Sequence, residues 1–303
     1  MMTTRSKLAR REALEGYIFL LPWIVGFLAF TLGPLIAALY LGFTNYTGTG
    51  PLRWVGIDNY IAIFTRDTLF WKSLQVTLVF ALLYLPLSLV IGFAVAMLMN
   101  QNIPGITFFR TLYYLPSVLS GVAVAVLWGF VFHREYGVLN WLLGLAGIGR
   151  IPWLQSTTWV LPALVTMELW RVGGSIIIYL AGLQGIPTEL YEAAKVDGAG
   201  WWRQLWNVTI PMMTPTIFFN LILGLIGTLQ VFTQAYILTR GGPNYASYFY
   251  SLNIYFRTFR DLRLGYASAL AWILFVITVG LSAIIFATSR HWVYYAGERE
   301  GTI

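Results

Sequence analysis

Cysteine is absent from this chain of 303 residues, histidine occurs only twice, and charged residues make up 10% of the sequence. The lack of cysteine excludes disulfide bonds, thiolate metal ligands and a cysteine nucleophile. His133 and His291 are far apart in the sequence, and we interpret each as an ordinary solvated or interfacial imidazole. We therefore expect no metal site in this chain.

Motifs for catalysis are missing as well. The three lysines, Lys7, Lys72 and Lys195, follow Ser, Trp and Ala, so the sequence has no Gly-Lys-Ser/Thr loop for a nucleotide phosphate. Neither a His-Glu-x-x-His nor a Gly-x-Ser-x-Gly pattern occurs. We expect no catalytic residue, and the chain cannot hydrolyse ATP by itself.

Hydrophobic residues, in contrast, make up 58% of the chain, and the mean hydropathy is +0.70. A soluble domain contains about 25% charged residues, so this composition indicates a membrane protein. Six apolar stretches are long enough to cross about 30 Å of hydrocarbon, and the first is too long for the core of a signal peptide. The sequence predicts an all-α membrane protein with six transmembrane helices in one domain, residues 17–292. The six stretches are residues 17–41, 74–99, 111–132, 159–182, 212–238 and 264–289.

The net charge of +7 is spread along the chain beside the apolar stretches. Basic residues in such places contact anionic lipid headgroups, so we expect membrane lipids as partners and no nucleic acid. Four cations precede the first helix, Arg5, Lys7, Arg10 and Arg11, whereas the first cation after it is Arg53. The first helix usually dominates insertion, so both termini, residues 1–16 and 293–303, are predicted to be cytoplasmic.

Two connecting segments between the predicted helices are rich in apolar residues. Residues 136–149 are too few to cross a bilayer and suit a helix lying in the membrane interface. Residues 245–256 contain six aromatic side chains, which suit an aromatic belt at the headgroup level or a surface that docks a partner.

The stretch YEAAKVDGAG at residues 191–200 is a charged segment within this apolar chain, and it must face water. It predicts a short helix, a turn at Gly198, and a second short helix that ends at Pro211. Glu189 and Glu192 lie in the first turns of the first helix, where the helix dipole favours negative charge. This elbow suits a cleft on another protein, and an ordinary cytoplasmic loop helix is the alternative.

Glu168 and Arg171 are the only charged residues inside a predicted transmembrane helix. They are three residues apart and therefore share a face. Either they line a hydrophilic cavity that binds sugar hydroxyls, with Trp170 as a nearby aromatic surface, or they neutralise each other and fix helix packing.

The fifth predicted helix contains a polar cluster in its outer half. Gln230, Thr233 and Gln234 follow i, i+3, i+4 spacing and are expected to share one stripe, with Thr228 close by. They could contact the same substrate, or they could form hydrogen bonds to neighbouring helices.

Together, these motifs resemble a known family. RTLYYLP at 110–116, YLAGLQGIP at 179–187, the Glu-Ala-Ala stretch with Ile210-Pro211, and LTRGGP at 238–243 resemble, in order and spacing, the carbohydrate-type ABC importer permeases of the maltose and glycerol-phosphate type. Arg240 departs from the small or amide residue that many relatives have there. The resemblance implies the ABC type I importer permease fold, with a cytoplasmic coupling helix in an EAA loop at about 187–211.

The resemblance also implies roles for residues and a set of partners. ATP and Mg²⁺ would be bound by a dimer of separate ATP-binding subunits, and the other expected partners are a second homologous permease subunit and an extracytoplasmic substrate-binding protein. The expected location is the inner membrane of a bacterial or archaeal cell. The expected coupling residues are Glu189, Glu192, Ala193, Ala194, Asp197, Gly198, Ala199 and Pro211, and the expected substrate pathway comprises Glu168, Arg171, Thr228, Gln230 and Gln234.

The predicted function is therefore that of a permease subunit, not an enzyme, which forms half of the translocation pathway for a sugar, oligosaccharide or polyol. A permease for glycerol 3-phosphate or a related phosphodiester is the alternative, since a guanidinium binds hydroxyls and phosphates alike. A lipid-modifying membrane enzyme fits less well because the acidic residues are few and scattered. A self-sufficient secondary transporter would show an internal repeat, which we do not find.

Overall fold

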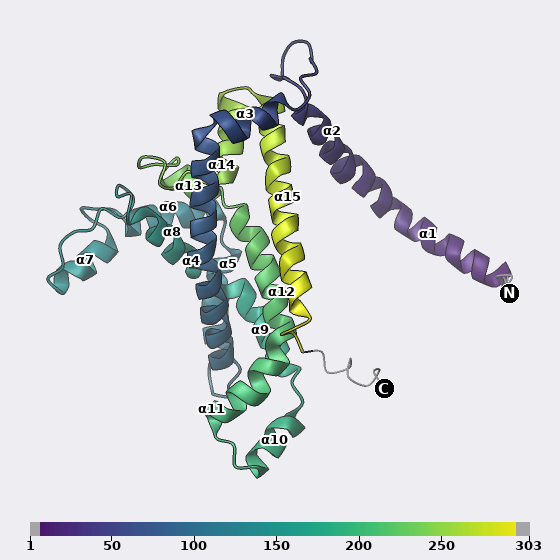
Figure 1. Cartoon of the computed structure of the whole chain (residues 1–303). Helices are drawn as coiled ribbons and strands as arrows, with labels where there is room; N and C mark the ends of the chain where they lie inside the picture. The colour runs from purple at the N-terminus through teal and green to yellow at the C-terminus, as the bar shows by residue number, and fades with distance from the viewer. Residues whose placement is uncertain (1–6, 295–303) are drawn as a thin grey trace. The chain divides into compact units, whose positions relative to one another are not determined.

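The computed structural model describes residues 7–294, which are largely helical and contain no β-strand, only an isolated bridge between Thr44 and Trp54 (Figure 1). The parts of the predicted terminal segments at residues 1–6 and 295–303 lie outside the described residues. The chain divides into two compact units, Met1–Arg66 with Ile254–Ile273 and Asp67–Asn253 with Leu274–Ile303. Each unit is described by itself.

The first unit begins with a long apolar helix. Helix α1 (Lys7–Phe27) continues through the π-helical turn η1 (Leu28–Leu32) into α2 (Gly33–Gly42). The helix therefore begins ten residues before the predicted start at residue 17. No residue in the most apolar 18-residue window of this helix is buried within the protein, as expected for a helix that contacts lipid.

A close backbone contact holds the other parts of the first unit together. This unit also contains α3 (Asp58–Arg66), η3 (Phe256–Arg260) and the first part of α15 (Leu264–Ser289). A Cβ at Gly265 would lie 2.1 Å from the carbonyl oxygen of Thr44, so only glycine allows this approach. The Asn59 amide donates to the carbonyl oxygens of Gly42 and Thr44, at 2.8 Å each.

The second unit is built around three helices that pack against one another in pairs, α4, α9 and α12. The side chain of Asp67 accepts hydrogen bonds from the first turn of α4 and so defines its start. At the other end of α4, Arg110 donates two hydrogen bonds to the carbonyl oxygen of Met99. The helices of this unit are α4 (Thr68–Met99), α5 (Ile106–Val118), α6 (Gly121–Val131), α7 (Val138–Leu145), α8 (Val160–Leu169), α9 (Gly173–Gln184), α10 (Thr188–Val196), α11 (Trp201–Gln204), η2 (Leu205–Thr209), α12 (Ile210–Leu229) and α13 (Thr233–Leu238), while α14 (Tyr250–Tyr255) and α15 belong partly to each unit.

By length and apolar composition, the described helices provide up to six membrane crossings if each of two bent helix pairs counts as one. Four helices in the described part of the chain are long and apolar enough to cross by themselves. The third and fourth predicted crossings are not single straight helices: α5 and α6 meet at 100°, and α8 and α9 meet at 46°. At the second bend Gly173 packs closely, because its Cβ would lie 2.5 Å from the carbonyl oxygen of Tyr113.

The fifth predicted crossing differs at both ends. Pro211 does not end the second short helix of the elbow, because α11 continues through η2 into α12. Pro211 is the second residue of α12 and directly follows the π-helical turn, so the helix continues through the proline where the backbone hydrogen-bonding pattern already changes. The crossing also breaks after α12, and a new helix begins at Thr233.

The aromatic segment at residues 245–256 is partly a core element. Tyr248, Phe249 and Tyr250 are buried, and the rings of Phe249 and Tyr250 pack edge-on against Phe80 and Phe70 of α4. The prediction of a belt or docking surface was therefore wrong for these three residues. Their apolar character serves packing within the protein instead.

Candidate functional site

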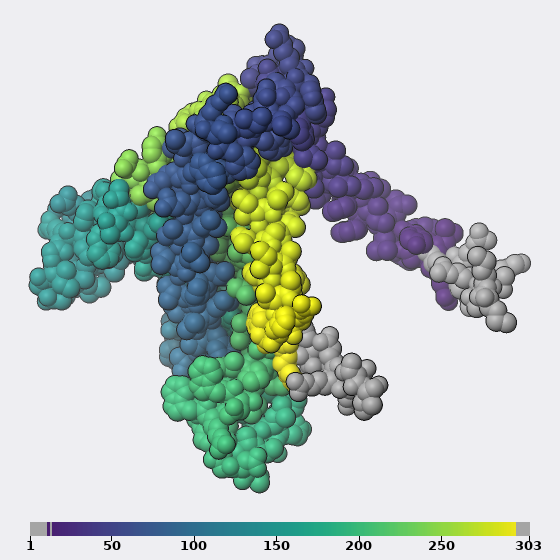
Figure 2. Space-filling view, viewed as in Figure 1, coloured from purple at the N-terminus to yellow at the C-terminus, as the bar shows by residue number. Residues whose placement is uncertain are grey.

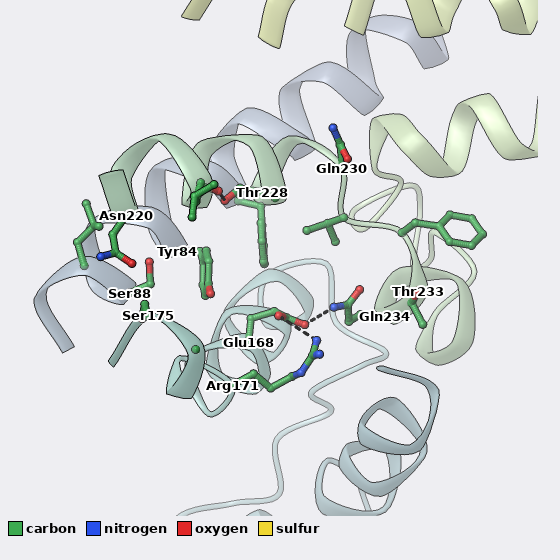
Figure 3. Close-up of a pocket in the computed structure, with 18 of the residues that line it drawn as sticks. Tyr84, Ser88, Glu168, Arg171, Ser175, Asn220, Thr228, Gln230, Thr233 and Gln234 are labelled. Atoms are coloured by element: carbon green, nitrogen blue, oxygen red, sulfur yellow. Dashed lines mark hydrogen bonds and ion pairs between the residues drawn. The ribbon is translucent and has the colours of Figure 1, made fainter. Parts of the chain in front are cut away.

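All five predicted pathway residues line one cavity of about 520 Å³ in the second unit (Figure 3). Its walls come from α4, from the bend between α8 and α9, and from α12 with the break that follows it. The aromatic side chains Phe80, Tyr84 and Phe232 also contribute to the wall. Polar groups and aromatic faces together are a suitable lining for a sugar.

A charged cluster lies at the bend between α8 and α9. Glu168 is at the end of α8, and Arg171 follows it in the short break before α9. Their nearest nitrogen and oxygen atoms, Nη1 and Oε2, are 3.6 Å apart, and the side chains are only 23% and 13% exposed for Arg171 and Glu168. The side-chain amide of Gln234 donates to Oε1 of Glu168. The two side chains form an ion pair and also line the cavity. Mutual neutralisation and a place in a hydrophilic cavity, the two interpretations of this pair, are therefore compatible.

The donors of Arg171 are only partly used. Its Nε is buried and has no hydrogen-bond partner among the residues that the structure describes. A guanidinium has five N–H donors, so one ion pair leaves several for another molecule. Such a group in the wall of a cavity can bind a hydroxyl or carboxylate oxygen.

The polar stripe predicted for the fifth helix is not a stripe on one helix. Gln230 follows the last residue of α12, Val231 and Phe232 are irregular, and Thr233 and Gln234 begin α13. The helical spacing was therefore the wrong reason for grouping these residues. They nevertheless line the same cavity, because the broken backbone folds around it. Thr228 is buried, and its hydroxyl donates to the carbonyl oxygen of Gly224 in its own helix.

Sequence reasoning missed four polar residues of the cavity wall. Tyr84 and Ser88 come from α4, Ser175 from α9 and Asn220 from α12. The spacing of four residues between Tyr84 and Ser88 was the only available signal, and it is common in packing helices. Trp170, expected beside the cavity, instead lines an apolar groove on another side of the bend and packs edge-on against Trp128 at 6.0 Å.

The predicted elbow forms a helix, a tight turn and a second helix. Helix α10 ends at Val196, Gly198 has a φ of +73°, and α11 begins at Trp201. The backbone N–H groups of Gly198 and Ala199 donate to the last carbonyl groups of α10, at 3.0 and 2.8 Å. Glycine stabilises this helix end because it takes a positive φ without a steric penalty.

The elbow projects from one end of the packed helices α4, α9 and α12 (Figures 1 and 2). No residue of α10 is buried, and Val196 is 88% exposed. The hydroxyl groups of Tyr191 and Thr209 lie 3.1 Å apart and connect α10 to η2. Of the predicted coupling residues, Glu189, Glu192, Ala193, Asp197 and Gly198 are exposed, and Ala194, Ala199 and Pro211 are half-buried.

Comparison with known proteins gives a consistent result. The profile of the family described as "Binding-protein-dependent transport system inner membrane component" matches residues 88–290. The chain is 41% identical to the probable ABC transporter permease protein YesP of Bacillus subtilis, over 98% of this chain and 97% of that protein. It is 35% identical to the lactose transport system permease protein LacF of Rhizobium radiobacter, over 95% and 98%.

Solved structures agree with the sequence relatives. The chain matches a chain of a bacterial ABC transporter involved in the import of the acidic polysaccharide alginate, with a TM-score of 0.82, 28% identity, and coverage of 94% of this chain and 97% of that one. A second structure of an alginate ABC transporter, in complex with an alginate pentasaccharide-bound periplasmic protein, matches equally well, with a TM-score of 0.82 and 27% identity, over 94% of this chain and 96% of that one. The family resemblance and the all-α importer permease fold predicted from the sequence are both confirmed. The chain belongs to the family of binding-protein-dependent transport system inner membrane components.

Proposed function

We propose that this chain is the permease subunit of an ABC importer for a sugar or oligosaccharide and forms half of the translocation pathway. The observation that carries the proposal is the cavity in the second unit, which presents a carboxylate, a guanidinium and amides within otherwise apolar helices. Relatives named for sugar transport support it, among them LacF and the trehalose/maltose transport system permease protein MalF of Thermococcus litoralis, at 30% identity.

The chemistry of the cavity suits a polyhydroxylated molecule. A sugar that leaves water needs a partner for each hydroxyl, and an unpaired buried hydroxyl costs about 1–3 kcal/mol. Glu168 accepts hydrogen bonds from hydroxyl groups, Arg171 donates to hydroxyl oxygens, and the amides of Gln230 and Gln234 do both. The ring of Tyr84 offers an apolar face to the C–H groups of a sugar.

The elbow would connect this pathway to the energy source. Helix α10 has no buried residue and carries exposed Glu189, Glu192 and Val196, so it offers an exposed face to another protein. In the proposed complex a dimer of ATP-binding subunits binds ATP and Mg²⁺, and its closure moves the elbow and rotates the attached helices. A second homologous permease subunit would complete the pathway, a substrate-binding protein would deliver the sugar, and lipids would cover the outer helices.

Glycerol 3-phosphate or a related phosphodiester is the less favoured substrate. Among the residues that the structure describes, Arg171 is the only cation that lines the cavity, and Glu168 offsets its charge. A dianionic phosphate close to a carboxylate would be repelled. A membrane enzyme is not favoured either, because the relatives are named as permease proteins.

The test is uptake by the complete transporter. The chain would be purified with its partner subunits, reconstituted in proteoliposomes with the binding protein and internal ATP, and assayed with lactose, maltose, trehalose, maltotriose, alginate oligosaccharides and glycerol 3-phosphate, each labelled. We expect ATP-dependent uptake of one or more of the sugars. Uptake of glycerol 3-phosphate alone, or of none of these compounds, would refute the proposal.

Variants of the charged cluster extend this test. Glu168→Gln and Arg171→Gln remove one charge each while preserving much of the side-chain volume. Each leaves the other charge without its partner, so we expect uptake to fall about tenfold or more, as a loss of about 1.4 kcal/mol implies. Thr278→Val is the control, because the hydroxyl of Thr278 bonds only the carbonyl oxygen of Leu274 in its own helix and does not line the cavity.

A further inference from the structure

The cavity has polar side chains at two levels along each of three segments of the chain. On α4, Ser88 follows Tyr84 by one turn. Ser175 of α9 follows Arg171, which lies in the break before that helix, by four residues. On α12, Asn220 precedes Thr228 by eight residues, which is about 12 Å along a helix. Figure 3 shows Ser88, Ser175 and Asn220 gathered on one side of the cavity, away from Glu168, Arg171 and Gln234, with Tyr84 between the two groups.

The group on this side of the cavity lies toward the elbow. Helix α9 leads into the elbow and α12 leads out of it, so Ser175 is closer to the elbow than Arg171, and Asn220 is closer than Thr228. The far end of α4 also lies there, because Asn100 and Gln101 line a small pocket together with Tyr191 of α10. In each of the three segments, the second polar residue, Ser88, Ser175 or Asn220, is therefore closer to the elbow than the first.

These three side chains can form more hydrogen bonds than they form within the protein. Ser88 donates to the carbonyl oxygen of Leu85, Ser175 to that of Val172, and Asn220 to that of Thr216, all in or beside their own helices. A hydroxyl that donates one hydrogen bond can still accept two, and an amide has a second N–H and a carbonyl oxygen. These groups are uncharged and suit hydroxyl groups as partners.

The wall between the two levels leaves space for a ring. Gly174 and Gly227 line the cavity, and a Cβ at either position would meet no atom within 4 Å. By contrast, a Cβ at Gly92 would lie 2.9 Å from Oγ of Ser175 and 3.3 Å from the ring of Tyr179. The open space therefore ends where Ser175 and Tyr179 pack against α4.

Tyr179 provides the second observation. It lies one turn beyond Ser175 in α9 and is completely buried in an apolar cluster that contains Ala96 of α4 and Met213 of α12. Its hydroxyl has no hydrogen-bond partner among the residues that the structure describes. An unpaired buried hydroxyl costs free energy, and the packed arrangement of these helices gives it no partner. The hydroxyl of Tyr179 is therefore better explained by a second arrangement, in which the helices are further apart.

We propose that Ser88, Ser175 and Asn220 form a second, uncharged sugar-binding station between the Glu168–Arg171 site and the elbow, and that Tyr179 is the next polar contact once the three helices separate. The sugar then passes from one set of hydrogen-bond partners to the next, so its hydroxyl groups are not left unpaired after they leave water. This inference rests on the proposed function, because it places a second site on the same pathway.

The first experiment measures access and does not depend on the identity of the sugar. Single cysteines are introduced at Ser88, Ser175, Tyr179 and Thr278 into the cysteine-free chain, and the complete transporter is treated with a negatively charged, water-soluble methanethiosulfonate in the ATP-bound and nucleotide-free states. We expect Ser88→Cys and Ser175→Cys to react in at least one state, Tyr179→Cys to react in only one state, and Thr278→Cys to react in neither. Unreactive cysteines at 88 and 175 in both states would overturn the station, and an unreactive cysteine at 179 would overturn the role of Tyr179.

The second experiment measures transport of the panel sugar with the fastest uptake. Asn220→Leu and the double variant Ser88→Ala/Ser175→Ala remove the hydrogen bonds and preserve much of the volume. We expect each to lower the maximal rate about tenfold or more, with Asn220→Gln restoring part of it and the binding-protein-stimulated ATPase retained. That ATPase readout would be lost if the variants only damaged the fold.

The outcomes separate the two proposals. Normal uptake by both variants, while Glu168→Gln and Arg171→Gln are impaired, would overturn the station and leave the proposed function intact. Failure of the unaltered complex to take up any panel sugar would refute the proposed function, and the thiol reaction would still decide whether Ser88 and Ser175 face a water-filled path.

Discussion

At Gly198 the backbone has a φ of +73°, and no atom lies within 4 Å of the position that a Cβ would occupy. A side chain there is strained by the backbone alone, by about 1–2 kcal/mol, and more for a β-branched residue. We predict that Gly198→Val preserves expression and membrane insertion but lowers coupling, because the exposed elbow changes shape while the packed helices are unaffected. ATP hydrolysis per sugar transported should rise in proteoliposomes.

Gly200 provides the matched control two residues away. It also has no atom near its Cβ position, but its φ is −68°, which any residue adopts. Gly200→Val therefore adds the same side chain without backbone strain and should leave coupling unchanged. Equal loss of coupling in both variants would show that the surface of the elbow, and not its turn, is what the substitution disturbs.

The two glutamines of the cavity allow a second prediction. Gln234 donates to Glu168, whereas Gln230 is exposed at the end of α12. Gln234→Leu should lower both sugar uptake and thermal stability in detergent, since it leaves a buried carboxylate with one donor fewer, at a cost of about 1–3 kcal/mol. Gln230→Leu should lower uptake with stability unchanged. If both variants lose stability and transport with unaltered sugar dependence, the glutamines bind only neighbouring helices.

At this scale the sequence is informative where a residue type is rare. Glu168 and Arg171 could be identified as site residues from the sequence, because a charged residue inside an apolar stretch costs free energy and usually has a function. Ser88 and Asn220 could not, because a single serine or asparagine in an apolar helix is also compatible with hydrogen bonding to its own backbone, which both residues do. Trp170 is next to Arg171 in the sequence, but the bend turns the two side chains toward different surfaces.

Among the elements, η3 and its connection to α15 bring together four charged residues, Arg257, Arg260, Asp261 and Arg263. Asp261 accepts hydrogen bonds from Arg260 at 2.9 Å and Arg257 at 3.1 Å, and the guanidinium of Arg263 lies over the ring of Tyr266. Burial alone would raise the pKa of Asp261, but the hydrogen bonds and positive charges of Arg260 and Arg257 outweigh it and hold the pKa below its usual value of 3.8.

The third prediction is a pH dependence of this connection. Because the pKa of Asp261 is lower in the folded state, the carboxylate contributes stability above its unfolded pKa, and this stability is lost as the pH falls through the folded pKa. Asp261→Asn should therefore lower the thermal midpoint at about pH 7, and the difference from the unaltered protein should shrink toward about pH 3. A difference that stays constant over this range would contradict the assignment.

The elements themselves were predictable in position but not in shape. Length and hydropathy place the six crossings, because about 20 apolar residues are needed to span hydrocarbon. The bends at 119–120 and 170–172 lie beside the dipeptides Ser120-Gly121 and Gly173-Gly174, which are common at turns, but their angles depend on contacts distant in sequence, such as that between Gly173 and Tyr113. Pro211 was misinterpreted for a related reason: the π-helical turn before it lets the helix continue through the position where the proline lacks an N–H.

For the whole molecule, the distribution of charge in the sequence bears on its orientation in the membrane. If the N-terminus is cytoplasmic, Lys and Arg number nine on each side of the membrane, so the total count gives no direction. The four cations before the first helix, with none between that helix and Arg53, favour a cytoplasmic N-terminus. With an even number of crossings, we then expect the C-terminus and the elbow on the same side, where ATP would be available to partner subunits.

The last prediction tests this orientation in living cells. Thr49 follows the first crossing and Lys195 lies in α10, and both side chains are exposed. Because the chain has no cysteine, Thr49→Cys and Lys195→Cys each introduce a single reactive thiol. With the outer envelope removed, a membrane-impermeant maleimide should label Thr49→Cys in sealed cells and Lys195→Cys only after the membrane is permeabilised. The reverse pattern would place the elbow outside the cell, away from ATP, and would contradict coupling through this segment whatever its resemblance to a coupling helix.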